Sequence, residues 1–267
     1  VTMGGWIHNE VSNTGGDCGD GLDIQVITEH DWSIGGVMMS RGGTGAAERG
    51  IPDDDINGGD AGNVDLSSIS ATFPGSSTDN DTASDGHILI SGICDASGGH
   101  GLADGDGGDG GQVRFIGNGP EDDNGQAATT TAIDGGINLL DSGLLQANGG
   151  DELHDTGSNG GVAGNVRIDA FESFAGSNDC PILIDGTIRS HGGRQFAEPV
   201  WSQAGTVRLF SYDTANDGDI LVRSGASISV FGTRNGVDGR VTIHADEDGG
   251  SDSNFVLESG ATIETNE

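Results

Sequence analysis

The octet "GLLQANGG" at residues 143–150 decides the reading of this chain, because its shape returns three more times. Each copy is a glycine, five residues and a glycine pair: "GVMMSRGG" from Gly36, "GICDASGG" from Gly92 and "GTIRSHGG" from Gly186. Degenerate copies, "GASISVFG" and "GATIET", begin at Gly225 and Gly260. A pattern that returns at intervals of tens of residues indicates a repeat architecture.

Two further strand patterns accompany the octet in a fixed order. An apolar triplet precedes it, as "IQV" at Ile24, "ILI" at Ile88, "INL" at Ile137, "ILI" at Ile182, "ILV" at Ile220 and "FVL" at Phe255. An alternating strand follows it, as "GNVDL" at Gly62, "GQVRF" at Gly111, "GNVRI" at Gly164, "GTVRL" at Gly205 and "GRVTI" at Gly239. This order predicts five full cycles and a sixth that stops after its second strand.

The cycles shorten along the chain while their strands keep their length. The first spans 64 residues, from Ile24 to Ile88, and the last spans 35, from Ile220 to Phe255. Repeats that hold three short strands and vary only in their loops are typical of stacked solenoid coils. We therefore predict an all-β protein with one domain over residues 1–267, a single parallel β-helix of about five to six coils with long lateral loops. Residues 1–22 form an N-terminal strand and lead-in, and residues 23–267 form the coils.

Alternation along each strand predicts which side chains enter the core. On the second strand one inward column is expected from Met38, Cys94, Leu145, Ile188, Ile228 and Ile263. The leading glycine of each octet is expected at the bend between the first and second strands. The closing glycine pair is expected to release the chain into a loop with positive φ.

The segments "GGDAGNVDL" at residues 58–66 and "GGVAGNVRI" at residues 160–168 resemble repeats of glycine-rich, right-handed parallel β-helix proteins that are secreted or surface-bound. The resemblance covers nearly the whole chain from about Asp23. It implies a right-handed helix, and it leaves function open, because this fold serves polysaccharide lyases and hydrolases, adhesins and viral fibres.

The charge of the chain restricts its partners. There are 43 acidic residues against ten basic ones, all arginine, and the net charge is -33. This composition resembles that of proteins from extreme halophiles, whose brine screens such a surface; an acidic, calcium-rich extracellular protein from seawater is the alternative. Nucleic acid is excluded as a partner, since phosphate binding needs clustered cations. No apolar stretch is long enough for membrane insertion.

An extracellular or cell-surface location is expected. The chain does not begin with Met, and "VTMGGWIHNE" lacks the features of a signal peptide, which fits either a mature product or a cropped start. "NDT" at Asn80 is an N-glycosylation sequon. Three cysteines, Cys18, Cys94 and Cys180, allow at most one internal disulfide, and Cys94 occupies an inward position.

The two ends of the chain predict self-association. Val1, Thr2 and Met3 read like the third strand "VTI" at residues 241–243, whereas the last coil stops after its second strand. We expect residues 1–3 of one copy to complete the unfinished coil of the next by strand addition, next to Phe255, Leu257 and Ile263. The alternatives are a segment cut from a longer solenoid and a chance match of three residues.

Acidic loops are the candidates for chemistry. Clustered carboxylates suit calcium, and the candidate ligands are Asp53, Asp54, Asp55, Asp60, Asp104, Asp106 and Asp109. Paired carboxylates of this kind also serve polysaccharide hydrolases, although an acidic composition alone produces such runs. No cofactor is required by any motif, and no basic cluster for an acidic sugar is visible. Trp6, Trp32 and Trp201 are candidates for sugar stacking, and Trp201 equally for a local cap.

The function expected from these features is structural, a subunit of a surface filament or fibre that assembles with copies of itself. The alternative is a carbohydrate-binding adhesin or a polysaccharide-degrading enzyme that uses the large loops of the early coils.

Overall fold

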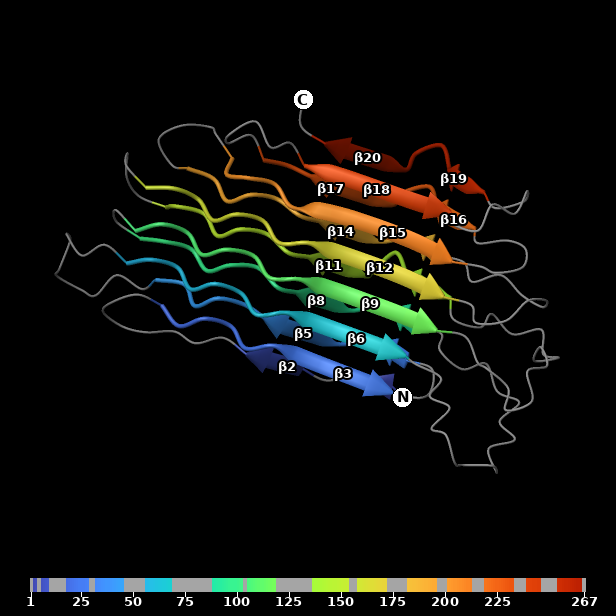
Figure 1. Ribbon diagram of the computed structural model, residues 1–267, viewed down its shortest axis with the longest axis horizontal. Coiled ribbons are helices and arrows are strands. Elements are labelled where there is room, and N and C mark those ends of the chain that lie inside the picture. Colours follow the sequence, from blue (N-terminus) through green and yellow to red (C-terminus); the bar gives the residue numbers. More distant parts are fainter. Residues whose placement is uncertain are drawn as a thin grey trace.

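The computed structural model of the chain describes residues 2–3, 6–9, 18–28, 32–45, 56–68, 88–102, 105–118, 136–153, 158–171, 182–195, 201–212, 219–232, 239–245 and 254–265. The regular structure in these ranges consists of strands alone. They form three parallel sheets that stack coil upon coil from one end of the molecule to the other (Figure 1).

Each sheet takes at most one strand from a coil, in chain order. The first sheet contains β1 (Thr2–Met3), β4 (Trp32–Ile34), β7 (Ile88–Ile90), β10 (Ile137–Leu139), β13 (Ile182–Ile184), β16 (Ile220–Val222) and β19 (Phe255–Leu257). The second contains β2 (Trp6–Asn9), β5 (Val37–Ser40), β8 (Ile93–Asp95), β11 (Leu144–Gln146), β14 (Thr187–Arg189), β17 (Ser227–Val230) and β20 (Thr262–Thr265). The third contains β3 (Ile24–Thr28), β6 (Val64–Ser68), β9 (Val113–Asn118), β12 (Val166–Phe171), β15 (Thr206–Tyr212) and β18 (Arg240–Ala245).

The predicted parallel β-helix with three strands per coil is therefore confirmed, and two strand assignments are corrected. Ile24–Thr28 aligns with β6 and belongs to the third sheet, not the first. Residues 2–3 pair with β4 in the first sheet, so the segment read as a third strand is a first strand. The coils begin at β1 rather than after a lead-in of 22 residues. With seven strands in each of the first two sheets and six in the third, there are six complete coils and a seventh that lacks its third strand.

The core consists of identical inward positions that lie over one another. The predicted second-strand column is confirmed, since Met38 pairs with Cys94, Cys94 with Leu145 and Leu145 with Ile188. Cys94, Leu145 and Ile188 are fully buried. Burying such a side chain contributes roughly 1.5 to 3 kcal/mol, and only stacking on neighbouring coils provides the burial.

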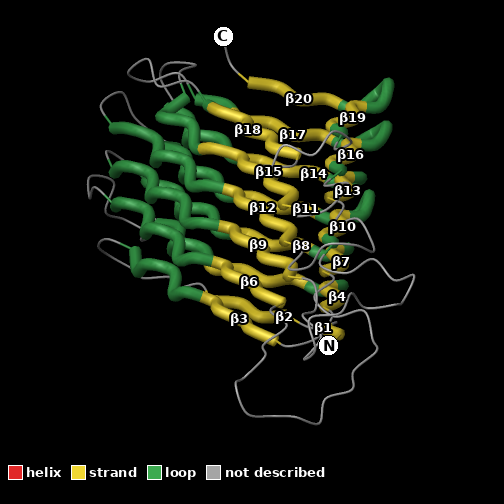
Figure 2. Tube along the Cα trace, turned by 45° about the vertical axis from the view of Figure 1, so that its right-hand side comes forward, coloured by secondary structure: helices red, strands yellow, loops and turns green. Residues whose placement is uncertain are grey.

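Beyond the second and third sheets, each coil extends sideways in two glycine-rich segments (Figure 2). The outgoing segment follows the second strand, and the return segment leads back to the third. Outgoing and return segments alternate along the solenoid axis and are joined by backbone hydrogen bonds of 2.8–3.0 Å. In each bond the N–H of one residue donates to the carbonyl of the residue that precedes it in the following series. The series is Gly19, Gly43, Gly59, Gly99, Gly108, Gly150, Gly161, Gly193 and Ser202. We call these residues the glycine column.

The closing glycine pair of the octet is explained by close packing rather than by positive φ. A Cβ atom on Gly99 would overlap the carbonyl oxygen of Gly43, and one on Gly150 would overlap that of Gly99. Among the described glycines, φ is positive only at Gly225 and Gly260, which lead the two late octets. The expected positive φ at the pair is therefore wrong, and positive φ occurs instead at the leading glycine of these two late octets.

Candidate functional site

The C-terminal end of the solenoid leaves its core uncovered by described residues. Phe255 and Leu257 are Cα partners of Ile220 and Val222, which are fully buried. In the last coil the same positions are 44% and 45% exposed, because no described coil lies above them. Ile263 of β20 is half-buried. Three of the predicted assembly residues therefore lie together at one end.

The N-terminal end presents the opposite edges of the same sheets. β1, β2 and β3 each pair on one side only among the described strands. Thr2 and Met3 lie opposite Ser33 and Ile34, whereas Val1 lies outside the described residues. If a second copy lay below this end, its β19 would lie next to β1 and its β20 next to β2. The third sheet ends at β18, one coil lower, so residues 1–3 do not supply the strand that this sheet lacks.

Some of the predicted calcium ligands accept backbone hydrogen bonds, and the others lie outside the described residues. Asp53, Asp54, Asp55 and Asp104 lie outside the described residues, as does Asn80. Asp60 Oδ1 accepts the backbone N–H of Asp109, and Asp109 Oδ1 accepts that of Val162, both at 2.7 Å. Asp106 Oδ1 accepts the N–H of Asn159 at 2.6 Å. These carboxylates tie each return segment to the next coil, and the described residues contain no group of three ligands suited to a metal ion. Calcium binding stays a prediction.

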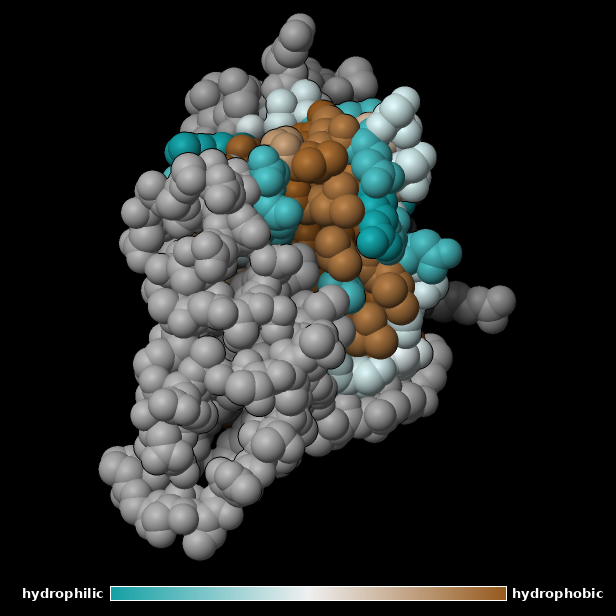
Figure 3. Space-filling view, turned by 90° about the vertical axis from the view of Figure 1, so that its right-hand side faces the viewer, coloured by the Kyte–Doolittle hydropathy of each residue, from teal (hydrophilic) through white to brown (hydrophobic). Residues whose placement is uncertain are grey.

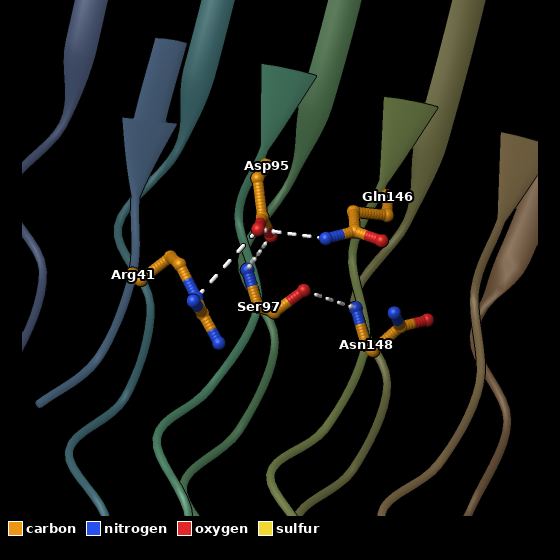
Figure 4. A network of polar contacts seen from close by, with 5 residues as sticks. All are labelled: Arg41, Asp95, Ser97, Gln146 and Asn148. Carbon is orange, nitrogen blue, oxygen red and sulfur yellow. Dashed lines mark hydrogen bonds and ion pairs between the residues drawn. The ribbon is translucent and has the colours of Figure 1, made fainter. Parts of the chain in front are cut away.

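A polar network joins three coils on the outgoing side (Figure 4). The carboxylate of Asp95, 3% exposed, accepts the N–H of Ser97 at 3.0 Å and the Nε2 of Gln146 at 2.7 Å. Arg41 Nε lies 3.6 Å from the same carboxylate, and Asn148 donates its N–H to Ser97 Oγ at 3.3 Å. A buried carboxylate with three partners fixes the coils against one another, so we assign this network to structure.

The structure describes the side chains of two of the three tryptophans that are candidates for sugar stacking. Trp32 is buried, and Trp201 packs in a cluster with His191 and Phe231. The guanidinium of Arg194 lies over the Trp201 ring, 4.1 Å from its centroid. One face of that ring is therefore occupied by a cation of the same chain. The side chain of Trp6 lies outside the described residues.

The two cysteines that the structure describes, Cys18 and Cys94, do not form a disulfide. Cys94 is a buried thiol, and burial together with the nearby Asp95 charge raises its pKa to about 12. Cys18 is also buried, and Cys180 lies outside the described residues. Cys94 therefore acts as a small apolar side chain, as expected from its inward position.

A column of three arginines on the third sheet was missed at the level of sequence. Arg114 and Arg208 are each Cα partners of Arg167, so the three occupy the same position on β9, β12 and β15. Their neighbours Val113, Val166 and Val207 are fully buried, so the arginines face outward. The signal was present in "GQVRF", "GNVRI" and "GTVRL", where the strand repeat itself places arginine in register. We call these three residues the arginine column.

The outer face of the first sheet is apolar over much of its length (Figure 3). The outward positions of β7, β13, β16 and β19 carry Leu89, Leu183, Leu221 and Val256. Ser33 and Asn138 interrupt this strip. No described residue covers Val256, which is 45% exposed.

Comparison with protein-family models, curated proteins and solved structures gives no match to this chain. The described residues contain no helix long and apolar enough to cross a membrane. A functional proposal for this protein therefore rests on its fold and its surfaces.

Proposed function

We propose that this protein is an extracellular structural subunit, a rod that stacks end to end into a surface filament or fibre. The observation that carries the proposal is the uncovered core at β19, where Phe255 and Leu257 are exposed at positions that every inner coil buries. A second copy is the occupant that matches this end, because β1 and β2 offer edges of the same two sheets.

The contact would add β1 of one subunit to β19 of the next and β2 to β20. Backbone hydrogen bonds would give the affinity, as in other cases of strand addition. Covering the exposed parts of two large apolar side chains contributes roughly 25 cal/mol per Å² of apolar surface. Such a head-to-tail contact does not close into a ring when the rods are collinear, so it propagates. The third sheet is left one strand short at each junction.

Substitution of the exposed core residues tests the assembly. We expect the 267-residue chain to form rods longer than one solenoid, because stacking buries the apolar end. Phe255→Ser combined with Leu257→Ser should leave single units. The measurements are negative-stain electron microscopy and sedimentation velocity over a range of NaCl concentrations.

Val256→Ser is the matched control, since Val256 lies between the two residues, is equally exposed, and faces outward. It should assemble like the parent chain. Thr2→Pro, which removes a backbone donor from β1, should also reduce assembly. Rods of unchanged length in the double variant would refute the proposal, and so would a parent chain that stays single at every salt concentration.

A further inference from the structure

The arginine column is a concentration of positive charge on a protein that is otherwise strongly acidic. Three of the ten arginines in the chain belong to it, and the net charge is -33. A fourth, Arg240, faces outward on β18, opposite Thr206 of β15. Figure 1 shows the strands that carry these residues, β9, β12, β15 and β18, side by side on one face.

Neighbouring strands lie about 4.7–4.9 Å apart, so like charges in register repel one another. Two carboxylates compensate in part. Asp65 lies opposite Arg114, and Asp169 is fully buried with an oxygen 2.5 Å from Arg167 Nε. Burial raises the pKa of Asp169, and the charge of Arg167 and then those of Arg114 and Arg208 oppose that rise. No described outward residue of β15 or β18 is acidic, and the carboxylate that the charge of Arg208 affects is that of Asp169 on the neighbouring strand β12.

Hydrogen-bonding capacity on this face is also incomplete. The Nε atom of Arg114 is buried and makes no hydrogen bond to a described residue, whereas the buried Nε of Arg167 is ion-paired with Asp169. The three cations in register face at most two negative charges, those of Asp65 and Asp169, so the column keeps a net positive charge. An external anion would relieve the repulsion by contacting the exposed parts of these guanidinium groups, whereas the buried Nε atoms lie out of its reach.

The order of the column defines the shape of that anion. Its charges run along the solenoid axis at the spacing of successive coils. A single small ion would meet one or two guanidinium groups, whereas a linear polymer with regularly spaced acidic groups would meet all three.

Rings at the end of the column favour a sugar polymer over other polyanions. The Arg208 guanidinium lies 4.4 Å from the centroid of the Phe210 ring, and Phe210 stacks on His244 at 4.6 Å with an angle of 15° between the rings. His244 is exposed. Phe210 is only 5% exposed, so the exposed His244 ring is the one that a pyranose carrying an acid could contact. A nucleic acid, with its dense phosphates, would be repelled by the surrounding acidic surface.

We propose that the outer face of the third sheet binds a linear acidic polysaccharide, whose carboxylate or sulfate groups contact Arg114, Arg167 and Arg208. The polysaccharide lies along the rod axis and places a sugar ring near His244. This site is separate from the rod ends, so binding does not require assembly.

Arg208→Gln is the most direct test, because Arg208 is the exposed arginine of the column, whereas Arg114 and Arg167 are half-buried. Binding of a chondroitin 4-sulfate hexasaccharide is measured by calorimetry at 0.15 M NaCl. Loss of one charge-assisted contact should weaken binding about tenfold. The double variant Arg114→Gln with Arg208→Gln should weaken it further. Arg167 is left in place, since its loss would remove the ion pair of the buried Asp169.

Arg189→Gln is the matched control, since Arg189 is exposed on the second sheet and the charge change is the same. It should bind like the parent chain. Unsulfated chondroitin separates carboxylates from sulfates as the recognised groups, and either result supports an acidic sugar. The proposal is overturned if the parent chain binds neither acidic sugar, or if Arg208→Gln binds like Arg189→Gln. Equal binding of neutral maltohexaose, or tighter binding of single-stranded DNA of similar length, would also overturn it.

Discussion

His191 shows how one side chain is controlled by its place in the stack. Its ring lies 4.7 Å from that of Phe231, and its Nε2 lies 2.7 Å from Ser229 Oγ. Burial, followed by the charges of Arg189 and Arg194, lowers the pKa of His191 to about 4. The imidazole therefore stays neutral in the folded protein at pH values where it would be protonated in the unfolded chain.

Stability should depend on the protonation of His191 between pH 6.5 and about 4. Because the folded pKa lies below the unfolded one, the contribution is full above pH 6.5 and is lost as the pH falls. From pH 7 to pH 5 the loss due to this group should be about 1 to 2 kcal/mol, allowing for its partial exposure. His191→Gln should show a correspondingly smaller drop in the free energy of unfolding, measured in guanidinium at each pH. An equal drop in both proteins would contradict the assignment.

The recurring glycines of the sequence lie where neighbouring coils pack so closely that a side chain does not fit. A Cβ at Gly111 would overlap the carbonyl oxygen of Gly62, and one at Gly164 would overlap that of Gly111. Each Cβ would point toward the preceding coil. Leu22 occupies the aligned position in the first coil, where no described coil lies below, and its side chain is 66% exposed.

Substitutions at this position should therefore differ between coils. Gly111→Ala should destabilise the protein by about 1 to 3 kcal/mol or more, because the methyl group forces two coils apart. Leu22→Ala changes an exposed side chain and should shift stability by no more than about 0.5 kcal/mol. Thermal unfolding followed by circular dichroism measures both. Equal effects would mean that coil spacing adjusts freely, contrary to the packing described here.

Leu22 also explains why the strand assignment failed at the start of the chain. Every later third strand has glycine two residues before its first valine, and this glycine distinguishes it from a first strand. The first coil has leucine instead, so "IQV" looked like the triplet of the first strand. The parallel coils and the inward columns were predictable, because they follow from alternation and repetition. The arginine column needed the register between coils, and the interleaved segments needed contacts that no local pattern encodes.

The whole molecule carries a charge of -33, and this charge sets the conditions in which it is stable. Mutual repulsion of surface carboxylates disfavours the compact state. At about 1 M salt the Debye length is only about 3 Å, so most of this repulsion disappears. Adaptation to concentrated brine stays a prediction that rests on composition.

Raising NaCl from 0.1 M to about 1 M should therefore raise the midpoint of thermal unfolding. KCl at the same ionic strength should act alike, since screening depends on ionic strength. A flat or falling midpoint would contradict the role of repulsion.

Adding millimolar CaCl2 at high NaCl tests the predicted calcium site, because only a specific site produces a further rise of the unfolding midpoint that MgCl2 does not reproduce.

The identical register of successive coils has a consequence for how such a rod changes its length over generations. A tandem duplication of the DNA for one winding, such as residues 137–181, inserts a unit whose upper and lower faces already match its neighbours. The product grows by about 4.7–4.9 Å without any compensating change elsewhere. Length can therefore vary by whole windings under selection, while the glycines inside each winding stay fixed.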